Sequence, residues 1–201
     1  MKWLLKSISY IFHPIIMPFL AVHFYFQKSP RFIPEQLIYA KQISLFILTA
    51  VLPIMVYFLL KTLGQTKSIH LKTAKERIFP LLVNSFIIGL ILYRVFPLDH
   101  IPELYYFFMG ILISNTTCLL LAILKFKASI HLIATGGVIM FFIAFAIHFS
   151  ININGSLALM VLITGAVASS RLYLKAHTGK ELIVGLIIGL TPQLMLLKYW
   201  L

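Results

Sequence analysis

Seven long apolar runs divide the chain and constrain its fold more than any other feature. Each run approaches the roughly 20 residues that a helix needs to cross the hydrocarbon core of a bilayer. Backbone groups inside a bilayer must be satisfied within their own segment, so helices are the expected structure. The runs cover approximately residues 9–26, 42–61, 79–96, 103–124, 132–150, 153–171 and 182–199. The sequence therefore predicts an all-α polytopic transmembrane helix bundle with six or seven spans, forming a single integral membrane domain over residues 1–201.

Composition excludes the other classes of protein. Hydrophobic residues make up 61% of the chain and charged residues 11%, against roughly 45–50% and 25% in soluble domains. Soluble, disordered, collagen-like and disulfide-scaffold proteins are therefore excluded. The net charge is +12, and the basic residues that produce it lie between the apolar runs. The sequence contains no recognisable nucleic-acid-binding module. We expect the bilayer, its anionic headgroups and phosphorylated lipids as partners, and no nucleic acid.

The first run is the least regular of the seven. It contains Pro14 and Pro18, which would kink a helix, and His13 and His23, which are costly in lipid. This run either crosses as a kinked helix, re-enters on the same side, or lies in the interface.

Polar residues concentrate in the loops after the second, fourth and sixth runs. These loops lie near residues 61–77, 125–131 and 171–181. Loops after even-numbered spans share one side of a membrane, so we expect the three polar clusters to meet. That side carries 12 of the 17 basic residues, which by the positive-inside rule favours the cytoplasm.

The strongest chemical signal runs from Ser170 to Glu181 and reads SRLYLKAHTGKE. His177 and Glu181 are four residues apart, so a helix beginning here puts them on one face. A carboxylate beside an imidazole fixes its tautomer and leaves the other ring nitrogen free to attack an electrophile. Arg171 offers a planar fork of donors suited to phosphate oxygens.

This segment resembles the third signature of the type 2 phosphatidic acid phosphatase (lipid phosphate phosphatase) superfamily, S-R-x5-H-x3-D. The spacing is the same, and Glu181 stands where the family has aspartate. The resemblance implies that His177 is the nucleophile that forms a phosphohistidine. It also implies that Glu181 orients His177 and that Arg171 holds the phosphate.

The superfamily's second signature is P-S-G-H, and residues 128–131 read Ala-Ser-Ile-His. The resemblance implies that Ser129 contacts phosphate and that His131 protonates the leaving oxygen as a general acid. Ile130 stands where the family has glycine. Its N–H can still donate, but its branched side chain crowds the approach of a phosphate.

The first signature, K-x6-R-P, is matched less closely. Arg77 corresponds to the arginine, Lys72 lies five positions before it, and Pro80 comes two residues later than in the pattern. Lys72 and Lys75 are both candidates for the lysine that binds phosphate together with Arg77. The resemblance covers about residues 67–190, and the three signatures follow in the family's order.

Structural interpretations remain open beside these chemical ones. Residues 178–181 also form a capping box, T-x-x-E, which can coexist with catalysis. Ser129 can instead cap the helix that follows it, and the lysines can simply set the topology. Gly185 and Gly189 form a G-x-x-x-G pattern, which predicts a helix-packing face.

The resemblance implies a metal-independent phosphatase without cofactor that hydrolyses a lipid phosphomonoester or a polyprenyl diphosphate. It also implies a bacterial inner membrane protein whose site faces the extracytoplasmic side, contrary to the charge bias. The alternatives are a catalytically inactive relative that binds or transports lipid phosphates, and an unrelated small transporter. The sequence leaves the oligomeric state open.

Overall fold

The computed structural model describes residues 2–62 and 73–201, and these residues form an all-helical bundle. In this part of the chain, six helices are long and apolar enough to cross a membrane. They are Glu35–Leu59, Ala74–Val95, Pro102–Ile123, Ile130–Phe149, Asn154–Tyr173 and Gly179–Tyr199. The predicted fold class is confirmed, and the chain is a multi-pass membrane protein.

The first apolar run forms two short helices in series. α1 covers Lys2–Ile11 and α2 covers Met17–Lys28. Pro14 lies in the break, because proline has no N–H to donate and its ring clashes with the preceding turn. Pro18 is in the first turn of α2, where a missing donor costs little.

α2 lies in the core of the bundle. Tyr25 is fully buried, and its ring packs 5.8 Å from that of Phe145 and 6.2 Å from that of Phe149 at the end of α7. The buried aromatic core continues through Phe107 and Phe141, whose ring centroids are 4.4 Å apart. Since α1 packs against α8 near the other end of the bundle, α1 and α2 together run along its length.

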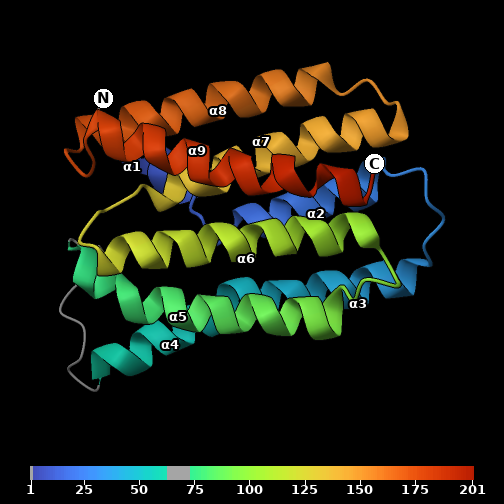
Figure 1. Cartoon of the computed structure of the whole chain (residues 1–201), viewed down its shortest axis with the longest axis horizontal. Coiled ribbons are helices and arrows are strands. Elements are labelled where there is room, and N and C mark those ends of the chain that lie inside the picture. Colours follow the sequence, from blue (N-terminus) through green and yellow to red (C-terminus); the bar gives the residue numbers. More distant parts are fainter. Residues whose placement is uncertain (1, 63–72) are drawn as a thin grey trace.

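The remaining helices alternate in direction along the bundle (Figure 1). They are α3 (Glu35–Phe46) continuing through the π-helical turn η1 (Ile47–Val51) into α4 (Leu52–Thr62), α5 (Ala74–Leu90) continuing into the π-helical turn η2 (Ile91–Val95), α6 (Pro102–Ile123), α7 (Ile130–Phe149), α8 (Asn154–Tyr173), and α9 (Gly179–Leu196) with a final 3-10 turn η3 (Leu197–Tyr199). The starts of α5, α7 and α9 and the ends of α6 and α8 gather at the end marked N. The predicted meeting of the polar loops is therefore confirmed for the described residues.

Glycines bring the first turns of α9 against those of α7. A Cβ at Gly185 would lie 2.7 Å from the carbonyl oxygen of Ser129, and one at Gly189 would overlap the carbonyl oxygen of Ile133. The contact positions rise together along both helices, so α7 and α9 run parallel. The predicted packing face is confirmed, and it sets the N-termini of the two helices side by side.

Candidate active site

His177 and Glu181 form the centre of the site. Thr178 caps α9 and forms a capping box with Glu181. The same Glu181 Oε2 accepts hydrogen bonds from the Thr178 N–H at 2.9 Å and from His177 Nδ1 at 2.9 Å. Glu181 thus caps α9 and contacts His177 at the same time. Because a carboxylate only accepts, Nδ1 carries the proton and Nε2 presents its lone pair.

Arg77 joins this pair from the first turns of α5. Its Nη1 donates to the carbonyl oxygen of Ala128 at 2.6 Å, and its Nη2 lies 3.4 Å from His177 Nε2. The residue is buried, with 6% of its surface exposed. The planar guanidinium therefore links α5, the 124–129 connection and the reactive nitrogen of His177.

The environment of His177 keeps its imidazole neutral. Its side chain is 1% exposed. Burial lowers the pKa of His177 from 6.5 to about 4, the charge of Arg77 adds to this effect, and the hydrogen bond with Glu181 opposes it. At neutral pH Nε2 is therefore unprotonated, as a nucleophile requires, with its lone pair facing Arg77 Nη2.

Two hydrogen-bonding atoms at the site are buried without a partner among the described residues. They are Ser129 Oγ and Arg171 Nε. The Ser129 backbone N–H donates to the carbonyl oxygen of Glu181 at 3.1 Å, but its hydroxyl caps nothing. The capping interpretation of that side chain is therefore wrong. Unpaired buried polar groups cost about 1–3 kcal/mol each, so a polar ligand that bonded to either atom would remove that cost.

The helix ends add a favourable field for an anion. α7 begins at Ile130 and α9 at Gly179, and both N-termini lie at this end of the bundle. Each contributes a partial positive charge from its aligned peptide dipoles. Together with Arg77 and Arg171 they give a site that favours an anion over neutral ligands.

His131 lies beside this cluster but is turned toward α1. Its Nε2 is 3.2 Å from the carbonyl oxygen of Ser9, and its ring meets that of His13 edge-on at 5.5 Å. A carbonyl only accepts, so His131 Nε2 carries a proton in this contact. Within residues 2–62 and 73–201, no hydrogen bond joins His131 to His177.

The lysine near His177 is not one of the two that the sequence predicted. Lys75 is exposed on the first turn of α5, and Lys72 lies outside the described residues. Lys127 was not predicted as a site residue, yet its charge acts on His177. Burial lowers the pKa of Lys127, and the charge of Arg77 lowers it further. Its position two residues before Ser129 was the available signal.

A second polar cluster, also absent from the prediction, lies at the opposite end of the bundle. Glu103 is fully buried and pairs with Arg31 Nη2 at 2.7 Å and with His148 Nε2 at 3.1 Å. Tyr25 donates to its other oxygen at 3.3 Å. An acid inside an apolar run was the signal that could have found it. Because its partners are satisfied, the cluster serves to fasten α2 and the following connection to α6 and α7.

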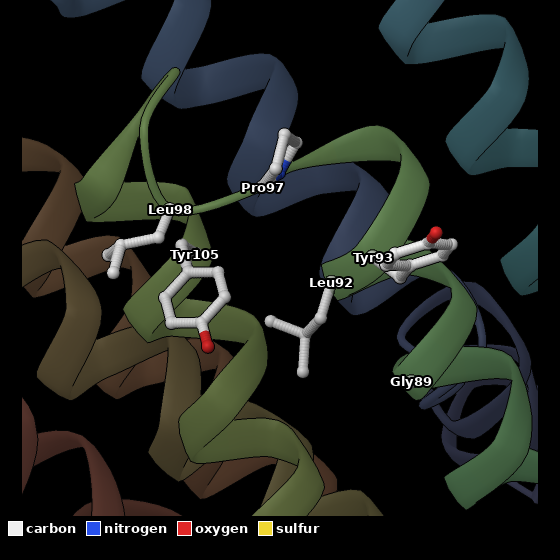
Figure 2. A pocket seen from close by; sticks show the side chains of 6 residues that line it. All are labelled: Gly89, Leu92, Tyr93, Pro97, Leu98 and Tyr105. Atoms are coloured by element: carbon white, nitrogen blue, oxygen red, sulfur yellow. The ribbon is translucent and has the colours of Figure 1, made fainter.

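A cavity of about 390 Å³ lies near that same end, between η2 and α6. Figure 2 shows Leu92 and Tyr105 facing each other across it. Its lining is mainly apolar and holds no histidine or acid: Gly89, Leu92, Tyr93, Pro97, Leu98 and Tyr105. This pocket therefore lies apart from the cluster around His177.

No family model, no curated protein and no solved structure matches the chain. The functional argument therefore depends on the arrangement of these side chains. Arg77, Ser129, His177 and Glu181 are joined by hydrogen bonds, Arg171 and His131 border them, and Lys75 stands apart.

Proposed function

We propose that the protein hydrolyses the phosphomonoester or diphosphate group of a membrane lipid through a phosphohistidine at His177. One observation carries the proposal: a neutral, buried imidazole presents Nε2 to Arg77 while Glu181 holds Nδ1. The buried, unpaired atoms of Ser129 and Arg171 add the donors that a transferred phosphoryl group needs.

The reaction balances with these groups alone. The Nε2 lone pair of His177 attacks phosphorus, and the bond from phosphorus to the lipid oxygen breaks. A protonated His131 gives that oxygen its proton. Water then attacks the phosphohistidine, gives a proton back to His131, and the N–P electron pair returns to Nε2. The Arg77 and Arg171 guanidinium groups and the Ser129 hydroxyl stabilise the equatorial oxygens in both steps.

The position of the site supports a lipid substrate. The cluster is at the end of a transmembrane bundle, beside helices with exposed apolar side chains such as Leu172 and Ile183. Acyl or prenyl chains can stay in the bilayer while the headgroup reaches the site. We place the protein in a bacterial inner membrane with the site on the extracytoplasmic side, in line with the resemblance in the signatures.

The test is phosphate release by purified protein in detergent, with a chelator present. The panel contains phosphatidic acid, phosphatidylglycerol phosphate and a polyprenyl diphosphate. We expect release by the wild type and none by His177→Asn, which keeps the size of the side chain. Lys75→Gln, on an exposed side chain of α5, is the matched control and should behave as wild type. Equal release by wild type and His177→Asn would disprove the proposal.

A second candidate function, binding or transport without turnover, is favoured by two observations. Ile130 replaces the small residue of the signature, and the neighbouring Ser129 N–H is already used by Glu181. This function predicts that phosphatidic acid binds and that Arg171→Ala weakens the binding, with no phosphate released. Turnover that requires His177 would exclude it.

A further inference from the structure

The polar contacts of α1 converge on the edge of the candidate active site. Ser170, which precedes Arg171, donates to the carbonyl oxygen of Leu5 at 2.6 Å, and its Oγ lies 2.7 Å from Ser9 Oγ. The carbonyl oxygen of Ser9 accepts a hydrogen bond from His131 Nε2. The α1 helix is thus attached through the two positions that flank the phosphate chemistry.

The connection of α1 to the rest of the chain resembles a hinge. The helix ends at Ile11, and a turn containing Pro14 separates it from α2. The turn is held by local bonds, from Ile16 N to the carbonyl oxygen of His13 and from Ile15 N to His13 Nδ1. Beyond this hinge α2 is fixed in the core, so α1 can move while the bundle stays intact.

The outer face of α1 suits a bilayer surface. Trp3 is 85% exposed and Tyr10 is 60% exposed, and Lys6 between them is also exposed. Aromatic rings and a lysine on one face are typical of helices that lie at the membrane interface. On the inner face, Ser9 is buried, and Ile8 packs against a small cluster that includes Val167.

The docked position of α1 conflicts with the roles of the residues beneath it. His131 cannot give the Nε2 proton to a leaving oxygen while the Ser9 carbonyl accepts it. Arg171 Nε stays buried and unpaired among the described residues, and the neighbouring Ser170 is bonded to Leu5 and Ser9 of α1. A phosphate that reaches Arg171 and His131 together needs this edge to open.

We propose that α1 is a gate over the candidate active site, which in its docked position occupies His131 and is fastened to Ser170 beside Arg171 and which swings out onto the bilayer surface to admit the lipid headgroup. This inference rests on the proposed function for its purpose. Its structural content, the opening of α1 away from His131, can be measured without any turnover.

A reversible cross-link tests the gate. Ser9→Cys/Ser170→Cys places two thiols where the hydroxyl oxygens are 2.7 Å apart, close enough for a disulfide. The native Cys118 is buried and should not interfere. Each single variant, Ser9→Cys and Ser170→Cys, is a matched control that cannot form this bond. The readout is the rate at which diethyl pyrocarbonate modifies His131 at pH 7, followed by mass spectrometry. The exposed ring of His100 serves as the internal reference.

We expect the oxidised double variant to be modified at His131 at least about tenfold more slowly than its reduced form, because the disulfide keeps the Ser9 carbonyl on His131 Nε2. If phosphate release is present, it should fall with oxidation and return on reduction. Equal His131 rates in the two forms would overturn the gate. A protein that never releases phosphate would refute the proposed function, while the His131 rates would still decide the gate.

A second variant keeps the test decisive if the double variant folds poorly. Ser9→Phe puts a large ring at a buried contact of α1, outside the core of the bundle. The gate predicts faster modification of His131 with the same His100 rate. An unchanged His131 rate in a folded Ser9→Phe protein would contradict it.

Discussion

Replacing Gly185 with alanine tests the packing that builds the site. The added Cβ would lie 2.7 Å from the carbonyl oxygen of Ser129 and 3.1 Å from its nitrogen. Ordinary C···O contacts in proteins are about 3.3–3.6 Å, so the N-terminus of α7 must move away from α9 by more than half an ångström. That nitrogen also donates to the carbonyl oxygen of Glu181, so the shift reaches the orienting residue of His177.

The magnitude follows from a matched control. Gly165 lies in the middle of α8 with nothing within 4 Å of an added Cβ. Both Gly→Ala changes gain about 1 kcal/mol in helix propensity, and only Gly185→Ala also suffers overpacking of about 1–3 kcal/mol. At roughly 2–4 °C per kcal/mol for a chain of this size, Gly185→Ala should melt about 2–12 °C below Gly165→Ala.

The assay is thermal unfolding in detergent followed by intrinsic fluorescence, to which the buried Trp200 contributes. Phosphate release should also fall by about ten- to a hundred-fold in Gly185→Ala, since a displacement approaching 1 Å suffices for such losses. Equal melting temperatures for the two variants would refute the close α7–α9 contact and the geometry argued from it.

Three further predictions concern individual side chains. The acid limb of the pH profile of phosphate release should have its midpoint near the His177 pKa of about 4, well below 6.5. As the pH falls, the unfolded chain protonates His177 before the folded protein does, so the stability that neutral His177 contributes is fully present above pH 6.5 and is lost toward pH 4. Melting temperatures measured across this range check the second expectation. Ser129→Ala should raise the melting temperature, since it removes a buried hydroxyl that has no partner among the described residues and that costs about 1–3 kcal/mol, yet it should lower phosphate release at least about tenfold. Ser170→Ala, which loses two hydrogen bonds, should instead be destabilised by about 1–3 kcal/mol. Arg77→Lys should weaken binding of inorganic phosphate in calorimetry, because a single ammonium cannot span the Ala128 carbonyl and His177 Nε2 as the fork does; unchanged affinity would contradict this role.

The spanning helices could be predicted from the sequence because apolar length is a local property. The predicted run 132–150 corresponds to α7, Ile130–Phe149, and the run 153–171 to α8, Asn154–Tyr173. The first run could not be placed, since its apolar pattern is continuous across Pro14 although the helix is not. The depth of α2 in the core depends on aromatic contacts with α7, more than a hundred residues away in the sequence.

Some contacts of the candidate site could likewise be predicted from the sequence, and others could not. The contact between His177 and Glu181 follows from helical spacing and is present at 2.9 Å. Arg77 could be associated with them by the signature order and the shared side of the loops. The contact between Ser9 and His131 spans 122 residues, and no spacing rule brings those positions together. The sequence also could not predict that the Ser129 hydroxyl has no partner among the described residues, because serine before a helix normally indicates a cap.

The most direct test of the account is to trap the covalent intermediate. Purified protein is mixed for a short time with phosphatidic acid or a polyprenyl diphosphate carrying a radioactive phosphate, denatured, and digested for peptide mapping. We predict an acid-labile, alkali-stable phosphoryl group on His177 in the wild type, and none in His177→Asn. Phosphate release without label on His177, or label that persists in His177→Asn, would contradict the central claim.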